Sequence, residues 1–143
     1  AAGDFLSGFL SQILKTRKKI IMAFIALEAL FVCFYLFLNI FDATFLYAMC
    51  LMLGISGGYW AVFVTNASEQ FGTNIRATVT TTVPNFVRGA VVPATLAFQY
   101  LTPVTGIVLS ALIVGLLTLA IAFFSITRLE ETYGKDLNYV EKH

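Results

Sequence analysis

Residues 69–89 read EQFGTNIRATVTTTVPNFVRG. This stretch begins as a charged turn between two apolar runs and continues without interruption into a third apolar run. Arg88 lies near the middle of that third run. A charged side chain at bilayer depth is costly, and it usually marks a pathway or an ion pair inside a helix bundle. We therefore expect the function of the chain to involve this segment.

The composition of the chain indicates whether it folds in water or in a membrane. Hydrophobic residues make up 59% of the 143 residues, aromatic residues 15% and charged residues only 12%, and the mean hydropathy is +0.85. A water-soluble domain carries about 25% charged residues, so about half of its usual solvating surface is missing here. The composition predicts an integral membrane protein.

Four apolar runs are long enough to cross a bilayer, since a membrane-spanning helix needs about 20 predominantly apolar residues. They cover residues 20–41, 45–65, 77–100 and 106–127. Residues 1–19 read as the end of a preceding helix and a basic loop, and residues 128–143 as a charged tail that we expect to be mobile. We predict an all-α polytopic membrane helix bundle with about four transmembrane helices plus the end of a preceding one. Because the chain opens in mid-helix without an initiator methionine, we expect it to belong to a larger protein.

Positive charges are distributed unevenly between the connecting segments. Every Lys and Arg except Arg88 lies at residues 15–19, in a polar loop expected at 66–76 or in the tail. The short turns expected at 39–44 and 101–105 contain none. Cytoplasmic loops carry an excess of Lys and Arg, so the basic loops and the C-terminus are predicted to be cytoplasmic. We expect a multi-pass protein of a bacterial inner membrane.

The third apolar run is weak as a membrane helix. Its Val, Leu and Phe residues favour insertion by about 0.3 to 0.6 kcal/mol each, whereas Arg88 alone opposes it by about 2.5 to 3.5 kcal/mol. Pro84 and Pro93 should break the helix. A helical wheel gathers a polar stripe made of Thr78, Thr81, Asn85, Arg88, Thr95 and Gln99. Such a helix needs neighbouring helices or a water-filled cavity beside it.

The first and second apolar runs each contain one further feature. Glu28 lies well inside the hydrocarbon by length, so its carboxyl should be turned inward and either protonated or paired. In the second run a face of small residues opposes a face that carries Tyr59, with Trp60 at its edge. The small residues are Gly54, Gly57, Gly58 and Ala61. Small faces permit close helix packing and aromatic rings suit a membrane interface, so which face lines a cavity stays open.

Several kinds of chemistry lack the residues that they need. Cys33 and Cys50 both lie within apolar runs and read as small buried hydrophobes, not as a disulfide or metal pair. The only histidine is His143, at the C-terminal residue, which disfavours histidine catalysis and a zinc site. No nucleophile–base pair and no basic face interleaved with aromatic residues is visible. We therefore expect no enzyme activity, no metal, no cofactor and no nucleic-acid partner.

Two loop motifs resemble those of the major facilitator superfamily (MFS) of transporters. Residues 69–79 resemble the Glu-x-x-Pro-Thr-x-x-Arg-x-x-Gly signature after the tenth helix of that family, with Gly72 replacing the proline and Val79 the final glycine. Residues 8–19 resemble the basic loop between its eighth and ninth helices, although Gln12 occupies the usual aspartate position. The resemblance implies that the chain is the C-terminal part of such a transporter, from the end of helix 8 through helix 12, within the C-terminal six-helix half.

The resemblance further implies transport of a small solute by alternating access. We expect coupling to an ion, with protons as the candidate and an anion as the candidate substrate. The other partners would be the lipid bilayer and the remaining helices of the parent transporter, without which the fragment would be inactive. Charged cytoplasmic loops would form a gate in the outward-facing state. The candidate gate residues are Glu69, Arg76, Arg17 and Lys18, with a solvated loop that merely follows the charge bias as the alternative.

The resemblance also suggests a transport pathway. It places Tyr59 and Trp60 at the cavity, and it places Asn85 and Arg88 at the cavity or at the moving interface. Arg88 would balance an anionic substrate, or a carboxylate in the remaining helices that carries the coupling proton; a static pair between Arg88 and Glu28 is the alternative. A different class of function fits the same four runs, namely a stand-alone four-helix membrane protein that acts as an assembly subunit or small oligomeric exporter.

Overall fold

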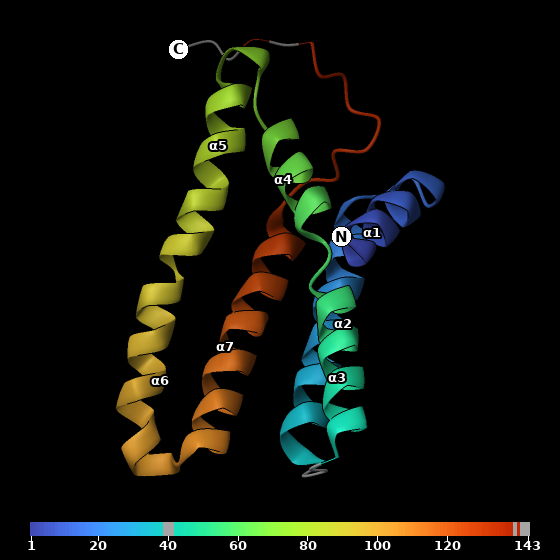
Figure 1. Cartoon of the computed structure of the whole chain (residues 1–143). Coiled ribbons are helices and arrows are strands. Elements are labelled where there is room, and N and C mark those ends of the chain that lie inside the picture. The colour runs from blue at the N-terminus through green and yellow to red at the C-terminus, as the bar shows by residue number, and fades with distance from the viewer. Residues whose placement is uncertain (39–41, 139, 141–143) are drawn as a thin grey trace.

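The computed structural model describes residues 1–38, 42–138 and 140 (Figure 1). Within these residues the regular structure is entirely α-helical, which confirms the all-α part of the prediction. The helices are α1 (Ala2–Ile13), α2 (Lys18–Phe37), α3 (Ala43–Ser56), α4 (Trp60–Glu69), α5 (Thr73–Gly89), α6 (Val91–Thr105) and α7 (Ile107–Arg128).

The long helices run roughly side by side, and α1 projects from the side of the bundle (Figure 1). Helices α3 and α4 follow one another in one column, and α5 and α6 do so in a second column. Helix α2 packs against α3 and α7, and α7 packs against α6. Helix α1 contacts both α3 and α4. The bundle therefore has two interrupted columns and two continuous helices.

The two ends of the bundle differ in charge. At one end lie the end of α2, the start of α3 and the turn between α6 and α7 (Figure 1). The connection between α4 and α5 and the segment after α7 lie at the opposite end. That opposite end also carries Arg17 and Lys18, which lie beside the last turns of α4 and α7. We call it the basic end.

Three helical segments are long and apolar enough to cross a membrane: α2, the α3–α4 column (Ala43–Glu69) and α7. Only 6% of the apolar part of α7 is buried, so most of its surface needs lipid or further helices as a neighbour. The span expected at 77–100 is divided between α5, with 17 residues, and α6, with 15. Each is shorter than the roughly 20 residues of a typical span. The three apolar segments are compatible with a multi-pass membrane protein.

The second expected span is longer than predicted and is interrupted within its length. Helix α3 ends at Ser56, α4 begins at Trp60, and α4 continues to Glu69. The polar loop with a short helical piece expected at 66–76 is much shorter than predicted, because only residues 70–72 separate α4 from α5. Two successive glycines of low helix propensity lie in the interruption.

Helix α1 makes its closest approach at this interruption. A Cβ atom added to Gly3 would lie only 2.8 Å from the Cα atom of Gly58. The Ser7 hydroxyl donates a hydrogen bond of 2.6 Å to the carbonyl oxygen of Gly58. This bond satisfies an acceptor near the end of α3, where helical carbonyls lose their usual donors. Of the small residues of the second run, Gly58 therefore packs against α1, whereas Gly54, Gly57 and Ala61 are exposed.

The α5–α6 column is interrupted at Ala90 and not at the two prolines. Pro84 lies inside α5, and Pro93 lies in the first turn of α6, where a missing N–H is tolerated. Because Pro93 has no N–H, the carbonyl of Gly89 has no donor four residues ahead in the chain. The interruption therefore falls just before Pro93.

The two short turns also differ from expectation or lie partly outside the described residues. The turn expected at 101–105 is wrong, because α6 continues through Pro103 to Thr105. The chain turns instead at Gly106, whose φ of 80° favours glycine. Of the turn expected at 39–44, residues 39–41 lie outside the described residues; α3 begins at Ala43.

The fully buried core is small and lies toward the basic end. It joins α2, α4 and α7 through Ile21, Ile25, Val62 and Ile126. The segment after α7 crosses this end of the bundle (Figure 1). Thr132 in this segment is only 2% exposed. The segment expected to be a mobile tail is anchored at Thr132, which hydrogen-bonds to α4, and at Glu131, which hydrogen-bonds to the loop before α2.

Candidate functional site: a buried polar network at the basic end

A buried ion pair joins the two loop motifs that the sequence singles out. Arg17 immediately precedes α2, and Glu69 is the last residue of α4. Arg17 Nη2 lies 2.6 Å from Glu69 Oε1, and Arg17 Nε lies 2.6 Å from Oε2. The two side chains are only 16% and 8% exposed. The Nη2 contact is a charge-assisted hydrogen bond and the Nε contact is a close ion pair, and together they tie the start of α2 to the end of α4.

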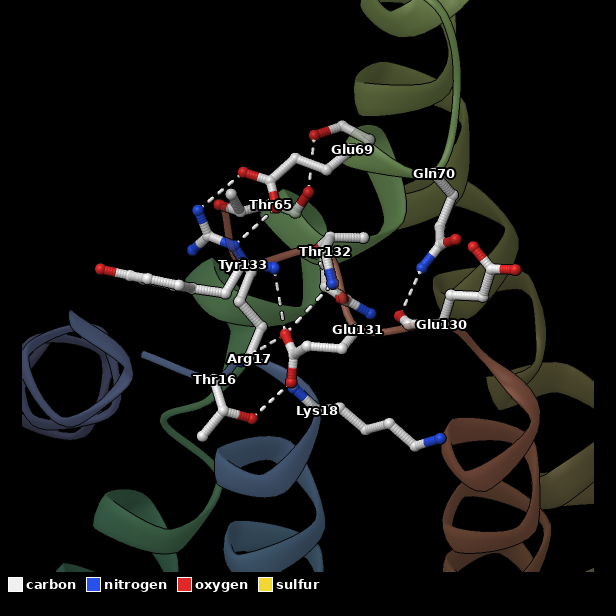
Figure 2. A network of polar contacts seen from close by, with 12 residues as sticks. Thr16, Arg17, Lys18, Thr65, Glu69, Gln70, Glu130, Glu131, Thr132 and Tyr133 are labelled. Atoms are coloured by element: carbon white, nitrogen blue, oxygen red, sulfur yellow. Dashed lines mark hydrogen bonds and ion pairs between the residues drawn. The ribbon is translucent and has the colours of Figure 1, made fainter. Parts of the chain in front are cut away.

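Glu131 lies beneath this pair and binds the start of α2 (Figure 2). Its carboxylate accepts hydrogen bonds from the Thr16 hydroxyl and from the backbone N–H groups of Arg17, at 2.9 Å, and Lys18, at 3.3 Å. It also accepts from the N–H groups of Thr132 and Tyr133, each at 3.1 Å. Backbone N–H groups at a helix N-terminus favour an anion. Glu131 therefore caps α2.

These contacts determine the protonation of Glu131. Partial burial raises the pKa of its carboxyl, but the hydrogen bonds from the Thr16 hydroxyl and three backbone N–H groups together outweigh burial. The net pKa of Glu131 lies below its usual value, because each of these donors favours the charged form. At neutral pH the residue is a carboxylate that accepts hydrogen bonds only.

Lys18 has a different role from the one expected of a gate charge. Its ammonium donates to the carbonyl oxygens of Thr127, at 2.7 Å, and Leu129, at 2.8 Å. These are carbonyls at the end of α7, which have no helical donor, and a cation is favoured at a helix C-terminus. Lys18 therefore joins the start of α2 to the end of α7.

The tail is also fastened to α4 by neutral groups. The Thr132 hydroxyl donates 2.9 Å to Asn66 Oδ1, and both side chains are buried. Gln70 Nε2 donates 2.9 Å to the carbonyl oxygen of Glu130 (Figure 2). The Arg17 guanidinium lies 5.9 Å from the centre of the Tyr133 ring, which covers one side of the ion pair. A buried polar group destabilises the fold unless it is hydrogen-bonded, and the bond between Thr132 and Asn66 meets that requirement.

Arg76 joins the tail farther along and is held by backbone groups. Its Nη2 donates to the carbonyl oxygens of Phe71, at 3.0 Å, and Leu137, at 2.9 Å. Of the four expected gate residues, the structure therefore brings Arg17 and Glu69 into direct contact. It places Lys18 and Arg76 in the same network through carbonyl groups of the tail.

Sequence reasoning missed Glu131, Thr132 and Asn66. Glu131 follows the last apolar run by only a few residues, and Asn66 lies in a segment expected to be a solvated loop. A carboxylate next to the end of a span can indicate a helix cap. Nothing in the sequence, however, assigns Glu131 to the start of a helix more than 110 residues earlier. The tail is part of the site because the chain returns across the basic end.

The expected pathway residues lie apart from this network. Tyr59 and Trp60 line an apolar cavity of about 210 Å³ between α2, α4 and α7, and Val87 from α5 also borders it. Asn85 donates 3.0 Å to the carbonyl oxygen of Thr81 on its own helix. The whole polar stripe of α5 and α6 is exposed on this chain. A role in transport for any of these residues stays a prediction.

The two charged residues expected within the membrane do not pair with one another among the described residues. Arg88 is exposed and has no ion-pair partner there. Glu28 instead faces the interruption of the α3–α4 column: its carboxyl interacts with the Tyr59 hydroxyl, and its Oε1 would lie 3.8 Å from a Cβ atom added to Gly57. The possible pair between Glu28 and Arg88 is therefore absent from this structure.

No protein-family model, curated protein or solved structure matches this chain. Its classification therefore rests on composition and on the arrangement of its helices. Three of them can cross a membrane by length and apolar character. The described chain is an all-helical protein compatible with a multi-pass membrane protein.

Proposed function

We propose that this chain is the C-terminal part of a secondary transporter of the major facilitator superfamily, which moves a small solute by alternating access with coupling to an ion. One observation carries the proposal: Arg17 and Glu69, one from each of the two resembling motifs, form a buried ion pair at the basic end. The two residues lie 52 positions apart in the sequence. Their contact is the arrangement that a gate built from both would require.

The network supplies a physical basis for a two-state gate. It connects α2, α4, α7 and the tail at one end of the bundle only. In the proposed mechanism it is intact while the basic end is closed and broken when that end opens to the cytoplasm. Removing one partner of a buried pair costs about 3 to 5 kcal/mol. The lower figure alone would shift an equilibrium between two states by about 150-fold.

The polar stripe supplies the proposed contact with the substrate or with the other half of the transporter. Asn85 and Arg88 are exposed on this chain, and a guanidinium at bilayer depth requires water or a carboxylate nearby. In the proposed transporter Arg88 meets an anionic substrate or a proton-carrying carboxylate of the remaining helices. Tyr59 and Trp60 border the cavity from the opposite column.

The experiment that tests the proposal is an uptake panel with the full-length protein in proteoliposomes. Organic anions, sugars and drugs are compared with and without a proton gradient. Glu69→Gln should change the rate of uptake more than the apparent affinity, because Glu69 lies in the gate and outside the cavity. Glu130→Gln is the matched control, since that carboxylate is 77% exposed and pairs with Lys135 at the surface. If Glu69→Gln has wild-type kinetics, the proposed gate is refuted. If no class of solute is taken up, the proposed transport function is refuted.

A stand-alone oligomeric membrane protein remains the competing function, because a second copy could also cover the exposed stripe of α5 and α6. Cysteine cross-linking separates the two. Asn85→Cys in a Cys33→Ser/Cys50→Ser background should cross-link to a second copy in the oligomer. In the transporter it should link only to an introduced cysteine within the same polypeptide.

A further inference from the structure

A cavity rich in lysine opens at the basic end, beside the loop that joins α1 to α2. Its volume is about 530 Å³. Lys15, Lys18 and Lys19 line it, together with the apolar side chains of Leu14 and Met22. Thr16 and Glu131 complete the lining. None of the roles described above uses Lys15 or Lys19.

The charges that line this cavity do not cancel. Glu131 is its single carboxylate, and that carboxylate is already held by the Thr16 hydroxyl and by backbone N–H groups. The ammonium of Lys18 bonds the last carbonyls of α7. Among the described residues Lys15 and Lys19 have no ion-pair partner, and both are exposed. The cavity therefore presents two available ammonium groups to an anion.

The position of the cavity indicates the source of that anion. Lys19 is followed directly by the apolar run of α2, which begins at Ile20. Leu14 at the rim is 58% exposed, and the outer side of α1 exposes Phe5 and Phe9, whose rings stack. With α2 spanning a bilayer, the lysines would lie where the headgroup layer meets hydrocarbon. Basic pockets beside transmembrane helices bind lipid phosphate groups.

We propose that Lys15 and Lys19 bind the phosphate group of an anionic phospholipid, whose acyl chains lie against Leu14 and the outer side of α1. A free phosphate ion would use the ammonium groups but not the apolar rim, which is why the lipid is the ligand that fits. Lys18 contributes its charge while remaining the cap of α7. The site does not depend on the transport function, and its test requires no uptake measurement.

The test measures lipid bound to the protein in nanodiscs by native mass spectrometry. Nanodiscs of phosphatidylcholine alone are compared with nanodiscs that also contain phosphatidylglycerol. The wild-type protein should retain phosphatidylglycerol preferentially. A lysine near a membrane surface contributes a factor of about five in binding, so Lys15→Gln/Lys19→Gln should weaken the preference by about 25-fold. Lys15→Arg/Lys19→Arg should keep it, and so should the control Lys135→Gln, whose lysine pairs with Glu130 outside the cavity.

Two measurements on the wild-type protein keep the test independent of how well the variants fold. High salt should release phosphatidylglycerol, because exposed charges are screened. Inorganic phosphate at the same concentration as the lipid should not displace it. The proposal is overturned if the double glutamine variant binds phosphatidylglycerol as the wild type does, if salt has no effect, or if inorganic phosphate displaces the lipid.

Discussion

Replacement of Glu69 by glutamine should destabilise the folded protein by about 3 kcal/mol. The change keeps the shape of the side chain and removes its charge. The Arg17 guanidinium, only 16% exposed, then loses both of its 2.6 Å contacts with a carboxylate. A charge left without its partner in a buried pair costs about 3 to 5 kcal/mol. We take the lower figure because water reaches part of Arg17.

The assay is a denaturant titration in detergent micelles that follows the fluorescence of Trp60, the single tryptophan of the chain. Trp60 is the first residue of α4, the helix that Glu69 ends, so the signal reports on the element that the substitution loosens. Glu130→Gln serves as the control. Its pair with Lys135 spans 3.3 Å at the surface, and such pairs contribute about 0 to 1 kcal/mol.

The double variant Arg17→Met/Glu69→Leu separates loss of the pair from loss of packing. Exchange of a buried pair for apolar residues of similar volume is often neutral or stabilising, so the double variant should unfold within about 1 kcal/mol of the wild type. The reasoning is refuted if Glu69→Gln costs less than about 1 kcal/mol. It is also refuted if the stability lost by the double variant equals the sum of the losses of Arg17→Met and Glu69→Leu measured singly. Additive losses mean that the two residues are not coupled.

Two further predictions concern the crossing of α1 and the cap of α2. Gly58→Ala should destabilise the protein strongly, since the added Cβ would lie 2.6 Å from the backbone nitrogen of Asp4. Gly54→Ala should be tolerated, because no atom lies within 4 Å of the added Cβ there. Equal thermal unfolding midpoints for the two variants would contradict the close crossing of α1 and Gly58. The pKa of Glu131 is lowered in the folded state, so its hydrogen bonds contribute stability above the unfolded pKa, near 4.5, and that contribution is lost as the pH falls through the lower folded value. Glu131→Gln should therefore flatten the loss of stability measured between neutral pH and acid, whereas an unchanged acid dependence would show that the cap contributes nothing.

The apolar runs allowed the helical class and most of the helix positions to be predicted. A membrane-spanning helix must bury its own backbone polar groups and present about 20 apolar residues. Both requirements apply to a single segment, so a helix can be predicted from its own sequence without knowing which helices it packs against. Helix boundaries were less predictable: the interruption at residues 57–59 lies where α1 crosses, and there the Ser7 hydroxyl bonds the carbonyl oxygen of Gly58 and Gly3 approaches Gly58 closely.

The candidate site divides in the same way. The sequence by itself predicted that Arg17 and Glu69 lie at the same end of the helix bundle, since charge bias and helix count suffice for that prediction. Only the tertiary structure decided that these two residues meet, that Lys18 and Arg76 bond to carbonyl groups, and that Glu131 caps α2 from the opposite end of the chain. The physical reason is that a local pattern selects the environment of a residue, whereas its partner depends on where the packed helices bring the rest of the backbone.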